Sequence, residues 1–243
     1  MTFHANTDIR WYVGTIAVSS HAKGATFTSS CEELDTTTIA SAGWTEVIAG
    51  NKSGAFDLTL MSDATDDGLD ETLWSSLAVA NTPQSFAIGS AVGSIGYCFK
   101  SLSTSYVPIE GNPGALAMAS LSGKSSGPIA RGNMLAVDTT AVTSSSTGSA
   151  VQVGAVSATK RLYAALHVVS ASGTLPTLDV KVQSDNASNF PSATDRITFT
   201  QATARTSQLS SVAGAVTDDY WRVSYTVAGT NPSFLFAVIV GIG

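Results

Sequence analysis

Apolar and polar residues alternate along several stretches of this chain, which is the pattern of strands that bury one face. The first clear pair comprises residues 43–50 (GWTEVIAG) and residues 55–61 (AFDLTLM). Four small or polar residues stand between them: Asn51, Lys52, Ser53 and Gly54. Such a segment between two alternating runs predicts a turn. The pattern therefore predicts a hairpin over residues 43–61 whose tip is the segment 51–54.

An amphipathic helix is expected directly after this hairpin, over residues 66–78 (DDGLDETLWSSLA). Acidic residues crowd its first turns, where the positive end of the helix dipole favours them. Leucines recur at the spacing of one helix face: Leu69, Leu73 and Leu77. We expect this stripe to cover the apolar face of the hairpin, and Trp74 to pack against Trp44.

Strands without helices are predicted throughout the second half. Alternation or continuous apolar character marks five segments: residues 161–170, 177–184, 195–202, 220–229 and 233–243. The last of these is apolar nearly throughout, which is typical of a central strand covered on both faces. Strands at this spacing, separated by Gly, Asn and Pro, predict an antiparallel sandwich.

Small, polar and helix-breaking residues interrupt the pattern in the middle of the chain. We therefore predict a β domain with an N-terminal arm and one helix over residues 1–135. A Ser/Thr-rich linker follows over residues 136–148, and a C-terminal β-sandwich occupies residues 149–243.

The composition narrows the range of partners. Charged residues make up 12% of the 243 residues, and the formal net charge is −6. Lysine and arginine form no cluster, so tight binding of nucleic acid through phosphate neutralisation is not expected. The N-terminal residues lack the regions of a signal peptide, and no apolar run approaches the roughly 18 residues of a membrane span. We expect synthesis in the cytoplasm and no contact with a membrane.

Two patterns suggest chemistry, and each lacks a required feature. Residues 63–68 resemble the start of a calcium-binding EF-hand loop, but Trp74 stands where the bidentate glutamate is needed. Residues 123–127 (GKSSG) match the G-x-S-x-G motif of hydrolases, but no helix is predicted after the serine. We interpret the first as a helix N-terminus and the second as part of a flexible linker.

The histidines and cysteines also predict no reactive site. His4, His21 and His167 have no metal-binding spacing, and His167 is expected to lie in the core or at a contact between subdomains. Cys31 and Cys98 are expected to be free thiols, with a single disulfide as the alternative. The sequence therefore predicts no catalytic residue, no metal and no cofactor.

The first half resembles the tail tube (major tail) proteins of long-tailed bacteriophages. The resemblance is carried by GWTEVIAGNKSGAFDLTL, by the acidic helix DDGLDETLWSSL and by the small-residue stretch SGKSSGPIARG. The second half resembles the accessory sandwich of phage virion proteins, through LDVKVQSDNASNFPSATDRITFT and YWRVSYTVAGTNPSFLFAVIVG. Together they imply a mainly β fold: an N-terminal tail-tube-like β-sandwich or barrel with one flanking α-helix, followed by a C-terminal antiparallel β-sandwich.

The resemblance also implies a function. Tail tube subunits close into hexameric rings that stack into a hollow tube, and DNA crosses the tube without being bound specifically. The expected protein is a structural component of the virion tail, not an enzyme, and is assembled in the host cytoplasm. Its expected partners are further copies of itself and virion proteins of the tape-measure and tail-terminator types.

Contact sites for such an assembly can be suggested from the predicted loops. The predicted hairpin tip offers four candidates for contact with the next subunit: Asn51, Lys52, Ser53 and Gly54. Residues 17–30 and 102–114 are predicted to be long polar loops that join one ring to the next. The alternatives are a capsid decoration protein, which would form trimers, and a carbohydrate-binding or adhesive sandwich with aromatic residues exposed in the second half.

Overall fold

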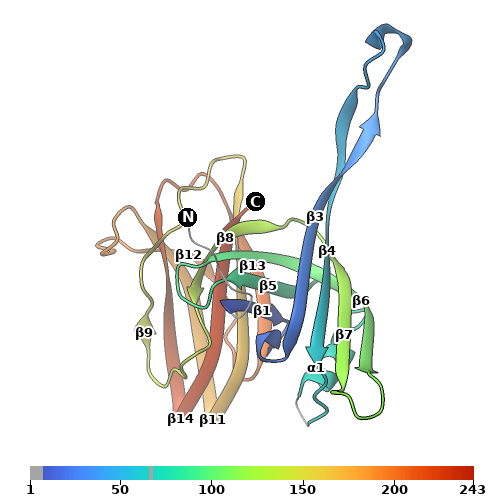
Figure 1. Cartoon of the computed structure of the whole chain (residues 1–243). Helices are drawn as coiled ribbons and strands as arrows, with labels where there is room; N and C mark the ends of the chain where they lie inside the picture. The colour runs from blue at the N-terminus through green and yellow to red at the C-terminus, as the bar shows by residue number, and fades with distance from the viewer. Residues whose placement is uncertain (1–7, 66–67) are drawn as a thin grey trace.

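Antiparallel strands make up most of the chain (Figure 1). The computed structural model describes residues 8–65 and 68–243, so His4, Asp66 and Asp67 lie outside the described residues. The strands in this part of the chain belong to one 14-stranded sheet, accompanied by one α-helix. This architecture confirms the mainly β fold class with one flanking helix.

The first half forms a curled sheet with the strand order β2-β1-β5-β6-β7-β4-β3. Its elements are β1 (Ile9–Val13), β2 (Ile16–Ala17), η2 (Val18–Ser20), β3 (Ala22–Asp35), η3 (Ile39–Ser41), β4 (Val47–Met61), α1 (Leu69–Ser76), β5 (Thr82–Ile88), β6 (Ile95–Glu110) and β7 (Met118–Ser125). The two ends of the sheet face each other across an aromatic core. The ring centroids of Trp11 on β1 and Phe56 on β4 lie 6.4 Å apart, and those of Phe27 on β3 and Phe86 on β5 lie 5.1 Å apart.

Helix α1 covers this core with the predicted leucine stripe. Leu69 and Leu73 are fully buried, and Leu77 packs half-buried against the same cluster. The predicted packing of Trp74 on Trp44 is wrong, because their exposed fractions are 64% and 79%. Trp44 precedes β4, whereas α1 follows it. The two indoles therefore lie at opposite ends of a long strand.

The second half is built around two long paired strands. Its elements are β8 (Ala130–Ala136), β9 (Ser146–Thr147), β10 (Val151–Gln152), β11 (Arg161–Asp185), β12 (Thr194–Thr198), β13 (Thr206–Ala213) and β14 (Tyr220–Ile242). β11 pairs with β14 over almost the full length of both strands, while β13 and β12 pair with the first and last parts of β11. The core between these strands includes Trp221, Leu166 and Val180, all fully buried.

β11 and β14 were each predicted as two strands, and each is one. The pairing register of β11 and β14 shifts three times between Val168 and Thr177. Such bulges absorb extra residues while the strand continues, so Gly173 and Pro176 do not end β11. The loops predicted over residues 17–30 and 102–114 are also wrong in large part, because β3 and β6 run through them.

The final apolar run is buried on both faces, as predicted. Phe236 and Val238 belong to the core of the second half, whereas Ala237 and Ile239 belong to a separate cluster at the junction of the two halves. This junction cluster also contains Tyr12 from β1, so it joins the first strand to the last.

Strand β8 joins the two halves into one continuous sheet. It pairs with β6 on one side and with β14 on the other. Three glycines face one another across these strands, since Gly132 is opposite both Gly96 and Gly241. A Cβ atom on Gly132 would collide with the carbonyl oxygen of Val240, and one on Gly241 would lie 2.6 Å from the carbonyl carbon of Ala130. The glycines therefore permit an approach of backbones that no other residue allows.

The Ser/Thr-rich stretch 136–148 packs along the second half. Val142 forms a bridge with Phe234, and β9 pairs with β14. Residues 123–127 were predicted to be part of a flexible linker, but the first three of them form the end of β7. The division into domains at residues 135 and 149 stays a prediction.

His167 lies at the junction, as predicted, and connects the two halves through both ring nitrogens. Nδ1 lies 2.7 Å from the carbonyl oxygen of Gly14, and Nε2 lies 2.7 Å from Oγ of Ser85. Because a carbonyl oxygen can only accept, Nδ1 carries the proton and Nε2 accepts from the serine hydroxyl. The ring also stacks on Tyr12, with centroids 5.2 Å apart. A neutral imidazole satisfies every one of these contacts.

Acid should weaken this junction through His167. Burial lowers the pKa of His167 to about 4, although its hydrogen bond to Gly14 and the charge of Asp138 oppose the shift. Between its unfolded pKa of about 6.5 and the folded value, only the unfolded chain takes up the proton, so stability falls as the pH falls. We expect about 2 kcal/mol less unfolding free energy at pH 5 than at pH 7, measured by urea denaturation.

The matched variant is His167→Asn, whose amide can still donate to Gly14 but cannot be protonated. It should be less stable at pH 7 and should lack most of the pH dependence between pH 7 and pH 5. An equal slope in both proteins would contradict the assignment of that slope to His167.

Candidate assembly surface

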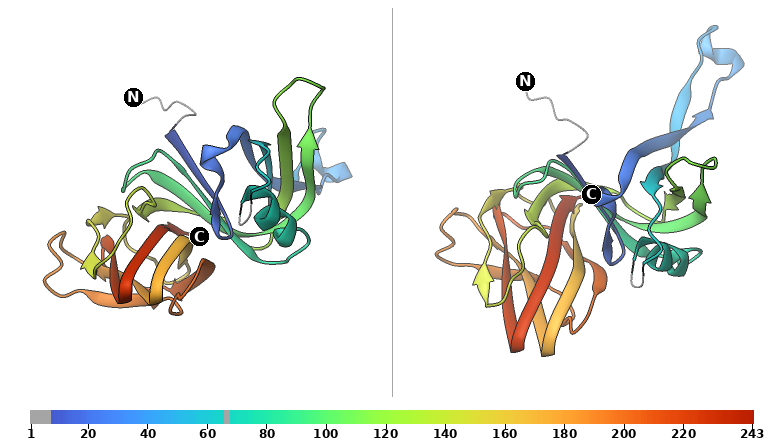
Figure 2. Two further views of the ribbon diagram at one scale, coloured as in Figure 1. Left: turned by 90° about the horizontal axis from the view of Figure 1, so that it is seen from below. Right: turned by 60° about the horizontal axis from the view of Figure 1, so that its bottom comes forward.

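A two-stranded arm projects from the body of the molecule (Figures 1 and 2). β4 pairs with β7 only through Ala55–Met61. Its N-terminal part, residues 47–54, pairs with β3 alone. We define the arm as residues 30–53. A two-stranded ribbon without a third strand or a helix is marginally stable in water. A ribbon of this length therefore indicates contacts beyond its own two strands.

Hydrogen bonds shape the tip of the arm. Thr38 and Ser41 bond to each other through both backbone and side chain around the 3-10 turn η3. The backbone N–H of Trp44 donates to the carbonyl oxygen of Ser41 at 3.0 Å. Ala42 and Gly43 then take positive φ values of 51° and 88°, which turn the chain into β4. The tip is thus a defined structure that presents particular side chains.

Large apolar side chains are exposed along the outer arm: Leu34, Ile39, Trp44, Val47 and Ile48. Trp44 has an exposed fraction of 79%, and Ile39 is fully exposed. Leu34 is opposite Ile48 in the ladder, whereas Val47 is opposite Asp35, so apolar groups occupy both faces of the ribbon. Large apolar side chains gathered in exposed positions on one projecting segment are typical of an interaction site.

The arm is also acidic. The arm contains one cationic residue, Lys52, and four carboxylates: Glu32, Glu33, Asp35 and Glu46. Hydrogen bonds from Thr37 lower the pKa of the Asp35 carboxyl, and the backbone N–H of Thr37 is 2.8 Å from Asp35 Oδ1. The surface that receives this arm should therefore combine apolar contact area with positive charge.

The four predicted contact residues are not at the tip. Asn51, Lys52, Ser53 and Gly54 lie inside β4, paired with β3, so the predicted turn is wrong. The chain reverses over residues 36–46 instead. The sequence signal for this reversal is the run Ser41-Ala42-Gly43. β3 shows no clear alternation of apolar and polar residues, because both faces of the arm are exposed to solvent.

The segment 51–54 occupies the root of the arm. The backbone N–H of Gly54 donates to Oγ of Ser125 at 2.9 Å, which links the arm to β7. A Cβ atom on Gly54 would lie 2.7 Å from Cδ1 of Ile129. A deletion of residues 51–54 would therefore disturb the register of the sheet, and a test of the arm is cleaner at the tip.

The other sequence candidates have structural roles. Asp63 accepts hydrogen bonds from the backbone and hydroxyl of Thr65 and contacts His21 at 3.3 Å. In the described residues, no group of three His, Cys, Asp or Glu side chains could hold a metal ion. Cys31 is exposed on the arm and Cys98 is buried, and both are free. No helix in the described ranges is long and apolar enough to cross a bilayer.

The tip should contribute little to folding. We expect Trp44→Ser to change the unfolding free energy by no more than about 0.5 kcal/mol, because the side chain is exposed. Trp11→Ala, in the buried aromatic core of the first half, should cost about 3–5 kcal/mol. Urea denaturation of the two variants checks this contrast, and a large loss for Trp44→Ser would mean that the tip is part of the folded core.

Comparison with known proteins finds similarity only to solved structures, several of them from phage-type tails. No family model and no curated protein matches the chain. A chain in the virion of a native gene transfer agent particle is similar with a TM-score of 0.44 and 14% identity, over 53% of this chain and 98% of that chain. The SPP1 tail tube is similar with a TM-score of 0.44 and 9% identity, over 53% of this chain and 78% of that chain.

A third structure is similar over nearly all of the chain. The SPP1 Dit protein, described as a paradigm of a hub adsorption apparatus, aligns over 96% of this chain and 98% of that chain, with a TM-score of 0.33 and 10% identity. The SPP1 structure is a tail tube, which is the class that the sequence resemblance named.

Proposed function

We propose that this chain is a structural subunit of a phage-type tail tube and assembles with copies of itself into stacked rings. The observation that carries the proposal is the arm, which exposes apolar side chains on both faces and projects from the body. The simplest partner that would bury these exposed apolar side chains is a second subunit. The sequence resemblance and the similarity to the SPP1 tail tube agree with this choice.

The arrangement of the arm suits a ring that stacks. The tip and helix α1 lie at opposite ends of β4, so the molecule presents two different ends (Figure 1). A contact between unlike surfaces closes into a ring or extends into a tube when it is repeated. Six subunits per ring follow from the sequence resemblance. Asn51 to Gly54 remain contact candidates, now at the root of the arm.

The charge balance suits a tube that conducts DNA. The net charge of −6 favours weak repulsion of a polyanion from the lumen wall, which permits passage without specific binding. Under this proposal the protein is located in the virion tail after assembly in the host cytoplasm. Its partners are copies of itself and proteins of the tape-measure and tail-terminator types.

The adhesive alternative gains no support from the second half. It requires aromatic side chains exposed in a groove, but Trp221 is fully buried, and the hollow lined by Tyr225 and Phe236 has only a half-buried tyrosine and a buried phenylalanine. Tyr225 packs edge-on against Phe236, with ring centroids 5.3 Å apart. The large apolar residue exposed at 84% in this half is Leu175, in the region where β11 and β14 bulge.

The proposal predicts assembly that depends on the tip of the arm. The purified protein should form rings or tubes of uniform diameter in negative-stain micrographs and a high-mass species in light scattering. The double variant Ile39→Ser/Trp44→Ser should remain a folded monomer, because the apolar contact area is lost. Leu175→Ser is the matched control and should assemble normally.

Other outcomes would point elsewhere. A native protein that stays monomeric at high concentration would refute the proposal. Trimers without rings would favour a decoration protein.

A further inference from the structure

The curled sheet of the first half has an open seam between β1 and the start of β3. β4 is the strand partner of β3 in the described chain, and β2 pairs with β1 only at Tyr12 and Val13. Among the described residues, no strand lies between the backbone edges of Ile9–Trp11 and of Ala22–Ala25, although Ser19 occupies the edge at Trp11, whose N–H donates to Oγ of Ser19 at 2.6 Å. Such edges are ready to bind a further segment of chain.

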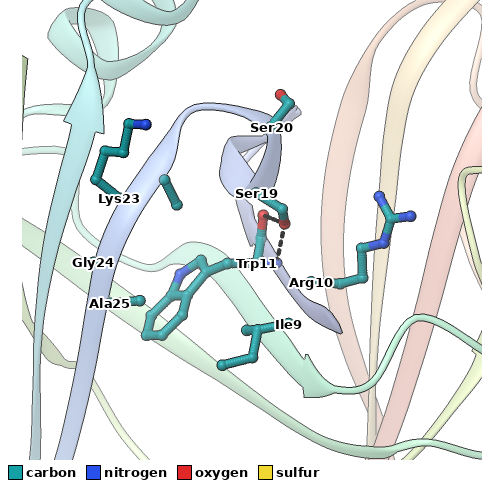
Figure 3. A pocket seen from close by; sticks show the side chains of 9 residues that line it. Ile9, Arg10, Trp11, Ser19, Ser20, Lys23, Gly24 and Ala25 are labelled. Atoms are coloured by element: carbon teal, nitrogen blue, oxygen red, sulfur yellow. Dashed lines mark hydrogen bonds between the residues drawn. The ribbon is translucent and has the colours of Figure 1, made fainter. Parts of the chain in front are cut away.

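A cleft of about 500 Å³ occupies this seam. Figure 3 shows the indole of Trp11 between β1 and β3 at the centre of the cleft. Ile9 and Ala25 add apolar surface, and Ser19 and Ser20 form the polar end. The indole N–H donates to Oε1 of Gln84 at 3.4 Å, and the ring stacks on Phe86. Trp11 is only 3% exposed, so it forms the buried floor of the cleft, and the accessible apolar surface comes from Ile9 and Ala25. We call this site the seam cleft.

The charges around the seam cleft are positive. Lys23 is exposed on one rim, and no ion pair in the described residues involves it. Arg10 stands on the other rim, with its side chain directed away from Trp11 (Figure 3). The lining contains no acidic residue. An apolar segment that carries carboxylates matches this site in both shape and charge.

We propose that the seam cleft receives the arm tip of another copy of the chain, with Trp44 packed against Ile9 and Ala25 above the buried Trp11, and with Glu46 facing Lys23. This inference rests on the proposed function and identifies the surface that receives the arm. Trp44 and Glu46 are exposed neighbours at the tip, where the backbone N–H of Glu46 donates to Oγ1 of Thr37 at 3.0 Å.

An arm cannot reach the seam cleft of its own chain. The cleft is at the start of β3, and the tip is beyond the end of the same strand. At about 3.3 Å per residue, Lys23 and Asp35 lie about 40 Å apart along an extended strand. Each subunit therefore gives its tip to one neighbour and receives a tip from another, which is the head-to-tail contact that rings and tubes need.

Other surfaces of the chain suit the acidic tip less well. Trp74 on α1 is exposed, but Asp70 and Glu71 stand on the first turn of the same helix. The hollow lined by residues 135–149 with Val92, Tyr225 and Phe236 has no cation in its lining. The hollow lined by residues 200–208 has Arg205 but no aromatic residue. The seam cleft combines both features.

Photo-crosslinking tests the contact directly. The substitution Trp44→p-benzoylphenylalanine is made in the full chain, assembled with an isotope-labelled unmodified copy and irradiated. Mass spectrometry should find crosslinks between the modified copy and residues 9–25 of the labelled copy. Assembly with crosslinks only elsewhere, such as near Trp74, or with none, overturns the seam cleft while leaving the proposed function intact. A protein that never assembles refutes both.

Charge reversal gives an independent test. Lys23→Glu should weaken assembly by at least about tenfold in the concentration required, because like charges then meet at the contact. Glu46→Lys should do the same, and the double variant Lys23→Glu/Glu46→Lys should restore assembly. Lys160→Glu, an exposed cation of the second half, is the matched control and should assemble normally.

Circular dichroism and thermal unfolding confirm that each variant is folded. If the double variant is no better than the single variants, Glu46 does not face Lys23 and the proposed register is wrong.

Discussion

The close approach of β8 to β6 and β14 is the constraint on which the rest of the structure depends. Gly96, Gly132 and Gly241 face one another across these three strands, and side chains at Gly132 and Gly241 would collide with the backbone opposite. Through this contact one sheet runs from the first half into the second. The junction cluster and the hydrogen bonds of His167 then hold the halves in one orientation. The direction of the arm relative to the second half follows from that orientation.

The strands of the arm are anchored at their root in a well-packed core. Phe27 and Phe56, one on each of its strands, contact Phe99 within the curled sheet, with ring centroids 5.1 Å and 6.5 Å away. Burial of aromatic side chains supplies large apolar area, and the same two strands continue outward beyond it. Exposed apolar strands are normally an aggregation hazard. In a subunit that assembles through them, the hazard becomes the binding surface, and acidic side chains restrict which surfaces can receive it.

Much of the core could be predicted because its signals are local. Phe56, Leu58 and Leu60 alternate with polar residues, and the leucines of α1 recur at helical spacing, so each pattern identifies its own buried face. The assembly site could not be predicted in the same way. Along the outer arm both faces meet solvent in the monomer, so the period of two that marks a half-buried strand is absent. Asn51 to Gly54 resemble a turn, but pairing with β3 keeps them extended.

The sequence by itself determined the fold class, the position of the helix, the burial of the last strand and the location of His167 at an internal contact. Each of these follows from periodicity or composition within a short window, where neighbouring residues share one environment. Only the tertiary structure decided where the hairpin turns, that Gly132 lies within a central strand, and that β1 and β3 leave a seam with Trp11 inside it. Those features depend on which distant strand comes alongside, because a partner strand, not the local sequence, satisfies the backbone hydrogen bonds.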